Sequence, residues 1–153
     1  MLYYAKGSPD MAFSEAELKA AFLEGLAAIE KAGLKIGRKP RRVLALPPDI
    51  TRVHSRAGQL TRFAYDYYGD ALTDVMPTLG THTPMKPAEL AEMFPGVPES
   101  LFRVHRWRDD VVTLGEVPAS YIEEVSEGKL SFTWPAQANR LLVEGGQDRK
   151  SVV

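Results

Sequence analysis

A short, wholly apolar run at residues 43–46 (VLAL) is closed at once by two prolines, and this feature most limits what the chain can fold into. Such a run is typical of a buried strand, and the prolines end it because they have no N–H to donate to a sheet. After it, the pattern predicts a helix at 57–68, a strand at 74–79 closed by Gly80, and a short helix at 87–94. The alternation of strand and helix predicts an α/β fold, with a mostly parallel sheet flanked by helices.

A first helix is predicted to begin at Ser14. Residues 14–17 (SEAE) have the spacing at which a Ser hydroxyl and a Glu carboxylate each satisfy a free backbone N–H. Apolar residues then recur at helical spacing as far as Ile29, and Gly33 is typical of a helix end. We expect this helix to pack its apolar face on the rest of the fold.

The second part of the chain is predicted to hold three further elements. Apolar residues at 101–104 and 111–114 predict a hairpin, residues 129–134 predict a strand, and residues 135–143 predict a helix with proline in its first turn. The last residues, 151–153, begin one more strand. Because a domain seldom ends on the first residues of a core strand, we expect residues 1–153 to form a single α/β domain that is an N-terminal fragment or a truncated form.

The composition excludes several classes of protein. With no cysteine among the 153 residues, thiolate catalysis, cysteine-ligated zinc and iron–sulfur clusters are ruled out. Nineteen Lys and Arg against twenty Asp and Glu leave a net charge of -1, so no overall basic field attracts nucleic acid. No basic leader with an apolar stretch begins the chain, and no window approaches the roughly 20 apolar residues of a membrane helix. We expect a cytoplasmic protein without nucleic-acid or membrane partners.

The loop after the first predicted strand, residues 48–54, is the first candidate site. In open α/β sheets, ligands bind at the carboxyl ends of strands, where loop N–H groups and a helix N-terminus favour anions. Arg52 would hold a phosphate or carboxylate, Thr51 would add a hydroxyl, and Asp49 would accept from a ribose hydroxyl or hold the Arg52 guanidinium. The simpler alternative is that Asp49 caps a helix and Arg52 is a surface residue.

The charge distribution favours an anion near this loop. Residues 38–62 hold seven Lys or Arg and one acid, Asp49, whereas residues 66–99 hold six acids and one Lys. A local basic field of this kind would attract an anionic ligand, and a solvated basic face is the alternative interpretation.

The second candidate is the loop at residues 79–84 (LGTHTP), which follows the next predicted strand at the same expected edge of the sheet. His82 in this loop would take and return a proton, and the alternative is a histidine that only hydrogen-bonds its own loop. His54 and His105 are interpreted as structural or surface residues, because the histidine spacing is not that of a zinc protease site. The two loops support each other as parts of one site.

Together, the motifs at residues 46–52 (LPPDITR) and 79–85 (LGTHTPM), with a helix between them and an acidic helix after them, closely resemble the N-terminal domain of the nickel-dependent lactate racemase family. The resemblance runs from about residue 15 to about residue 144. Members of that family racemise or epimerise 2-hydroxy acids with a nickel-pincer nucleotide. In the family chemistry a histidine takes the hydroxyl proton while hydride moves to the cofactor, and the planar keto acid is reduced from either face.

By motif match, the resemblance implies that His82 is one of two catalytic histidines. Arg52 would also meet the carboxylate of a small hydroxy-acid substrate. The residues expected to contact the nickel-pincer nucleotide are Asp49, Ile50, Thr51 and Arg52. The family's second catalytic histidine, its cofactor-bonding lysine and its nickel-ligating histidine have no counterpart in this chain.

The resemblance therefore predicts the N-terminal part of a nickel-pincer-nucleotide-dependent 2-hydroxy acid racemase or epimerase, inactive alone. A missing C-terminal domain or a self-association partner would complete the cleft. Two alternatives belong to other classes: a non-catalytic module that binds an anion or nucleotide through residues 49–52, and a structural or interaction domain that buries the apolar region 111–134 against a partner.

Overall fold

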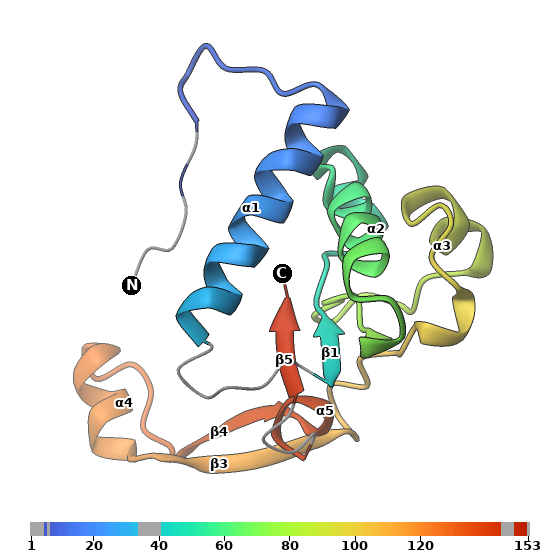
Figure 1. Cartoon of the computed structure of the whole chain (residues 1–153). Helices are drawn as coiled ribbons and strands as arrows, with labels where there is room; N and C mark the ends of the chain where they lie inside the picture. The colour runs from blue at the N-terminus through green and yellow to red at the C-terminus, as the bar shows by residue number, and fades with distance from the viewer. Residues whose placement is uncertain (1–4, 6, 34–40, 145–148, 153) are drawn as a thin grey trace.

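The computed structural model describes residue 5 and residues 7–33, 41–144 and 149–152. In chain order the elements are α1 (Glu15–Gly33), β1 (Arg42–Ala45), the 3₁₀ helix η2 (Ile50–Ser55), α2 (Ala57–Tyr68), η3 (Gly69–Ala71), β2 (Leu72–Val75), α3 (Pro87–Met93), η4 (Glu99–Leu101), β3 (Val111–Val117), α4 (Ala119–Val125), β4 (Trp134–Asn139), α5 (Arg140–Val143) and β5 (Arg149–Val152). The α/β fold is confirmed. A three-stranded parallel sheet has the order β2-β1-β5, and β3 and β4 form a separate antiparallel pair (Figure 1).

The central strand β1 holds this fold together. Its residues Val43 and Leu44 are fully buried and Ala45 is almost so, as expected for a parallel strand covered on both faces. Parallel neighbours need a crossover connection, and α2 supplies it between β1 and β2. Pairing continues beyond both strands, because Met76 N donates to Ala45 O at 2.9 Å and Thr78 N to Pro47 O at 2.8 Å. The segments that follow β1 and β2 therefore leave the sheet side by side.

The hydrophobic core lies between this sheet and the helices α2 and α3. Phe94, which directly follows α3, is almost fully buried and packs its ring against Phe102 with the centroids 5.1 Å apart. The buried residues of this cluster are Val43, Ala45, Leu72, Val75, Met93, Phe94 and Val97. Among the described residues, no helix is long and apolar enough to cross a lipid bilayer.

The three helices predicted for the first part of the chain are confirmed as α1, α2 and α3. At the start of α1, Ser14 N donates to Glu17 Oε2 at 2.9 Å and Glu17 N donates to Ser14 Oγ at 3.3 Å, which is the predicted reciprocal cap. Helix α1 packs along α2, where the Phe22 and Phe63 rings lie 6.4 Å apart (Figure 1).

The strand predicted at 74–79 is displaced, because β2 ends at Val75. Pro77 cannot donate to a neighbouring strand, so the regular ladder stops before it. Apolar residues continue in the sequence beyond β2 because Met76 and Leu79 are buried in the loop that follows the strand.

The predictions for the second part of the chain are largely wrong. Residues 101–104 form no hairpin with 111–114; instead Phe102 lies beside Val75 of β2, and β3 pairs with β4. The predicted helix at 135–143 is mostly strand, since β4 has a free edge that tolerates Pro135.

The predicted strand at 129–134 is also wrong, because those residues lead from α4 into β4, which only begins at Trp134. Helix α5 begins later than predicted because Asn139 caps it, its Oδ1 accepting from Leu141 N at 2.9 Å. The short helix α4 had no sequence prediction. The terminal strand is found as β5, and residue 153 lies outside the described residues.

One glycine allows α2 and the end of α3 to approach closely. A Cβ built on Gly58 would lie 1.7 Å from the carbonyl oxygen of Met93, a backbone atom that cannot move alone. Alanine normally favours a helix over glycine, but here we expect Gly58→Ala to lower the free energy of unfolding by about 1–3 kcal/mol through overpacking. Urea unfolding checks this.

The matched control is Gly115→Ala in β3, where a Cβ would meet nothing within 4 Å. It should leave the free energy of unfolding unchanged or slightly higher. A Gly58→Ala protein as stable as the Gly115→Ala protein would contradict the close approach.

Candidate functional site

Two loops meet where β1 and β2 end. Asp49 follows β1 and His82 follows β2, and His82 Nδ1 lies 2.6 Å from Asp49 Oδ2. Because β1 and β2 are parallel neighbours, their carboxyl ends lie at the same edge of the sheet, as the sequence predicted. The site therefore pairs one carboxylate with one imidazole across 33 residues of sequence.

Asp49 is held by its own loop as well as by His82. It is 5% exposed and caps η2, where its Oδ1 accepts from Thr51 N at 3.1 Å and from the Thr51 hydroxyl. Burial raises the pKa of Asp49, but the hydrogen bonds from Thr51 and His82 outweigh burial and hold the pKa below its ordinary value of 3.8. Asp49 therefore stays an anion beside the imidazole.

His82 has one ring nitrogen held and one open. The carboxylate of Asp49 favours the tautomer with its proton on Nδ1, so Nε2 carries the lone pair. The side chain is 56% exposed, and no hydrogen bond to Nε2 joins it to any described residue. The loop is shaped by Gly80, whose φ of +58° suits glycine, and by His82 N donating to Leu79 O at 3.0 Å. Such a pair can take a proton at Nε2 and return it.

The other residues predicted to form the site in the first loop, Ile50, Thr51 and Arg52, make different contacts. Ile50 packs against the hydrophobic core, and the Thr51 hydroxyl is engaged by Asp49. Arg52 is exposed, and its Nη1 donates to Thr51 O at 3.5 Å. Asp49 therefore holds His82 and not the Arg52 guanidinium, which corrects one of the roles considered for it. It also caps η2, as the simpler interpretation of this loop had it.

The basic residues of the first segment do not form one field. Arg42 begins β1 whereas Arg52 follows the opposite end of that strand. Arg62 pairs with Asp66, Nε to Oδ1 at 2.8 Å. Residues 38 and 39 lie outside the described residues. Of the described cations in this segment, Arg52 is the one in the loop that holds Asp49.

The remaining histidines lie apart from this site. His54 is exposed in η2, and His105 Nδ1 lies 3.0 Å from Nδ2 of Asn139, the residue that caps α5. This contact gives His105 a structural place in the fold. Within the described ranges, no three His, Cys, Asp or Glu side chains are grouped so as to hold a metal ion.

Neither member of the Asp49–His82 pair lines any of the three pockets found among the described residues, and neither does Arg52. A pocket of about 230 Å³ lies beside the His82 loop, and Leu79 and Met85 of that loop line it together with Phe102. A second pocket of about 470 Å³ collects four arginines, which the sequence could not group because they come from separate segments. Of the pair, His82 is exposed to solvent and Asp49 is buried.

Comparison with known proteins finds one solved structure that is similar to this chain. No family model and no curated protein matches the chain. A crystal structure of a protein from Thermotoga maritima, a structural genomics target, matches with a TM-score of 0.67 and 26% sequence identity. The match covers 92% of this chain and 33% of that one, so this chain spans about a third of the length of the Thermotoga protein.

The lowered pKa of Asp49 predicts an acid-dependent loss of stability. A carboxyl group whose pKa is lower in the folded protein stabilises it fully above the ordinary value of 3.8, and this contribution is lost as the pH falls through 3.8 toward the folded pKa. We expect Asp49→Asn to remove part of the fall in unfolding free energy below about pH 5. Urea unfolding at a series of pH values measures it.

Asp70→Asn is the matched control, since it removes an exposed carboxylate from η3. If the difference in unfolding free energy between the wild type and Asp49→Asn stays constant as the pH is lowered, the carboxylate of Asp49 is not stabilised as its contacts indicate.

Proposed function

We propose that Asp49 and His82 are the acid–base pair of an enzyme that acts on a small 2-hydroxy acid, as a racemase or epimerase of the nickel-pincer type. The observation that carries this proposal is the 2.6 Å contact between His82 Nδ1 and Asp49 Oδ2 at the carboxyl ends of two parallel strands. The motifs that resemble the nickel-dependent lactate racemases lie at these same two loops. In this proposal the protein works in the cytoplasm.

In this function His82 Nε2 takes the proton of the substrate hydroxyl and later returns it. Asp49 keeps the ring oriented and stabilises the imidazolium that forms, in the manner of the carboxylate of a catalytic triad. The pKa of Asp49, held low by Thr51 and His82, supports this role because the carboxylate must be charged. Asp49 is thus a positioning residue and His82 the catalytic one.

Arg52 is proposed to bind the substrate carboxylate. Its guanidinium is exposed, and its one hydrogen bond to a described residue is the long contact to Thr51 O at 3.5 Å. A guanidinium can hold a carboxylate through two parallel N–H···O bonds, which fixes orientation as well as charge. Its place three residues after Asp49 puts it on the same loop as the acid–base pair.

The described residues fit only part of what a nickel-pincer nucleotide needs. Residues 49–52 supply an anion contact and His82 supplies proton transfer, but the described ranges hold no group of three His, Cys, Asp or Glu able to bind a metal. In the proposed enzyme its metal ligands come from residues other than those described here or from another chain.

The function is tested on the protein purified from its native source, with nickel quantified in the same sample and the interconversion of D- and L-lactate followed by chiral chromatography. We expect His82→Ala to lower kcat by about 10²–10⁴-fold, because proton transfer is lost. His54→Ala, which removes an exposed histidine outside the site, should change neither kcat nor KM.

Two further variants separate positioning from binding. Asp49→Asn should lower kcat and Asp49→Glu should restore part of it, whereas Arg52→Gln should raise KM for lactate. Full activity of His82→Ala would remove His82 from the mechanism. No turnover by the wild type, together with anion binding that depends on Arg52, would instead indicate the non-catalytic module.

A second candidate function, an interaction domain, is favoured by a separate observation. The β3–β4 pair and the segment between its strands project from the parallel sheet (Figure 1). These elements expose large apolar side chains. Those at least 41% exposed in this segment are Leu114, Tyr121, Val125, Leu130, Phe132 and Trp134. Phe132 and Trp134 lie together, with their ring centres 5.8 Å apart, and exposed apolar side chains that lie together are typical of surfaces that other proteins cover.

If this surface associates with a second copy, the mass measured by sedimentation velocity should rise with protein concentration. Trp134→Ser should then hold the protein at 17.0 kDa at every concentration. Val53→Ser, which removes an equally exposed apolar side chain from η2, is the matched control and should still associate. A wild-type mass of 17.0 kDa throughout would contradict self-association through this surface.

A further inference from the structure

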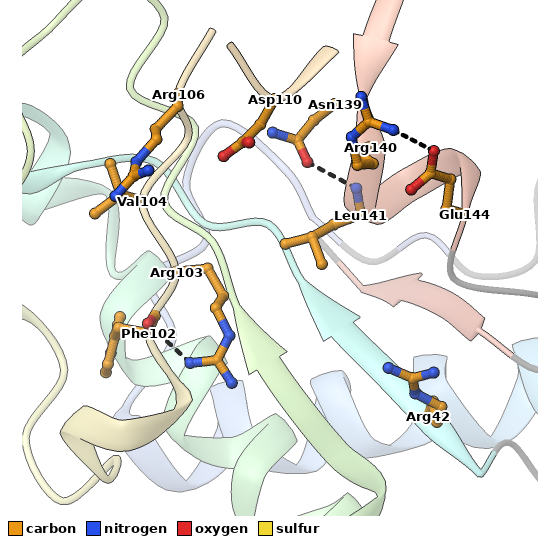
Figure 2. Close-up of a pocket in the computed structure, with 10 residues that line it drawn as sticks. All are labelled: Arg42, Phe102, Arg103, Val104, Arg106, Asp110, Asn139, Arg140, Leu141 and Glu144. Carbon is orange, nitrogen blue, oxygen red and sulfur yellow. Dashed lines mark hydrogen bonds and ion pairs between the residues drawn. The ribbon is translucent and has the colours of Figure 1, made fainter. Parts of the chain in front are cut away.

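The pocket of about 470 Å³ lies at the end of β1 opposite to Asp49 and is called the arginine pocket here (Figure 2). Its polar lining consists of Arg42, Arg103, Arg106, Arg140, Asp110, Asn139 and Glu144. Phe102, Val104 and Leu141 complete the lining with apolar side chains. Its volume lies within the roughly 300–1,000 Å³ of small-molecule sites. It shares no residue with the Asp49–His82 pair.

Two of the four guanidinium groups are already paired. Arg140 pairs with Glu144 (Figure 2). Arg103 Nε lies 2.9 Å from Oδ1 of Asp74, which is 5% exposed. Arg103 Nη1 also donates to Ser100 O at 2.8 Å. Arg103 is therefore held in one orientation before any ligand arrives, which lowers the entropy cost of binding.

The other two guanidinium groups have no partner within the part of the chain that the structure describes. Among the described residues, neither Arg42 nor Arg106 has a hydrogen bond or ion pair through its side chain, and both line the pocket from opposite sides (Figure 2). Asp110 is the one carboxylate of the lining outside the Arg140–Glu144 pair. The pocket thus keeps an excess of positive charge facing its interior.

The frame around these side chains is fixed by the backbone. Arg140 N donates to Asp110 O at 2.8 Å, and the buried Asn139 is engaged both by Leu141 N and by His105. These hydrogen bonds hold the backbone where β3 and β4 meet α5, whereas the exposed side chains of Arg42 and Arg106 have no such contact to a described residue. Apolar lining from residues 102–104 and Leu141, beside two available cations, suits an organic anion.

We propose that the arginine pocket binds a small phosphate monoester with an apolar or aromatic body. Guanidinium groups hold tetrahedral phosphate oxygens through paired N–H···O bonds, and the two unpaired cations outweigh Asp110, the one remaining carboxylate of the lining. The apolar body lies against Phe102, Val104 and Leu141. This inference is independent of the proposed racemase function, because the two sites have no residue in common.

The probe is phenyl phosphate, titrated by isothermal calorimetry into the full chain, with inorganic phosphate, benzoate and benzyl alcohol as comparisons. Phenyl phosphate should bind most tightly, because it alone combines a dianion with an aromatic body. Arg42→Gln and Arg106→Gln should each weaken it about tenfold or more, since a hydrogen bond to a charged group contributes about 1.5–3 kcal/mol.

Each matched control removes one arginine charge at a position one or two residues from the pocket arginine in the sequence. Arg41→Gln neighbours Arg42 outside the pocket lining, and Arg108→Gln neighbours Arg106, with the Arg108 guanidinium stacked 3.6 Å from the Trp107 ring centre. Both controls should bind phenyl phosphate within about twofold of the wild type, because screened surface charge contributes little. Urea unfolding of all four variants verifies that each is folded.

Three outcomes would overturn the proposal. Equal losses of affinity in the control and pocket variants would mean that diffuse charge attracts the ligand. Tighter binding of benzoate than of phenyl phosphate would assign the pocket to carboxylates. The absence of saturable binding at millimolar phenyl phosphate would mean that no site exists. Arg52→Gln should leave phenyl phosphate binding unchanged, so failure here is separable from failure of the racemase function.

Discussion

The burial of β1 between two parallel neighbours is the constraint on which the rest of the structure depends. Val43 and Leu44 have no exposed surface, and the strand pairs with β2 on one side and β5 on the other. A strand buried on both faces can present polar chemistry only at its ends. Both candidate sites obey this limit, since Asp49 follows the carboxyl end and Arg42 stands at the amino end of the same four residues.

At the carboxyl end of β1, the Asp49 carboxylate contacts both its own loop and a loop distant in the sequence. Oδ1 of Asp49 satisfies the first turn of η2 through Thr51, and Oδ2 reaches His82 on the next loop. The local hydrogen bonds keep the carboxylate charged despite its burial, and the charged carboxylate in turn orients the imidazole. A residue that caps a helix is thereby also the partner of the exposed histidine, so the structural and functional interpretations of Asp49 are compatible.

Basic residues that are close in the sequence do not lie close together in the folded protein. The basic excess in residues 38–62 is divided between the two ends of β1 and the surface pair Arg62–Asp66. The four arginines that do lie together come from three separate places in the chain, from residue 42 to residue 140. Counting charges along the sequence therefore does not show where cations gather, because the residues of one segment are divided between both ends of a strand.

The sequence by itself determined the elements whose signals are local. The reciprocal cap at residues 14–17 and the helix at 57–68 depend on contacts within a few residues, and β1 is recognised from its short apolar run before two prolines. The position of two loops directly after successive strands of an expected parallel sheet was enough to predict that Asp49 and His82 share one edge.

Only the tertiary structure decided the rest, because it depends on contacts between distant residues. The partner of β3 was β4 and not residues 101–104, since pairing is set by which edges meet after the chain has turned through α4. Residues 135–139 became a strand because that free edge accepts a proline, and Asn139 moved the helix start. The arginine pocket has no sequence signal, because its cations gather only when β1, residues 102–106 and α5 come together.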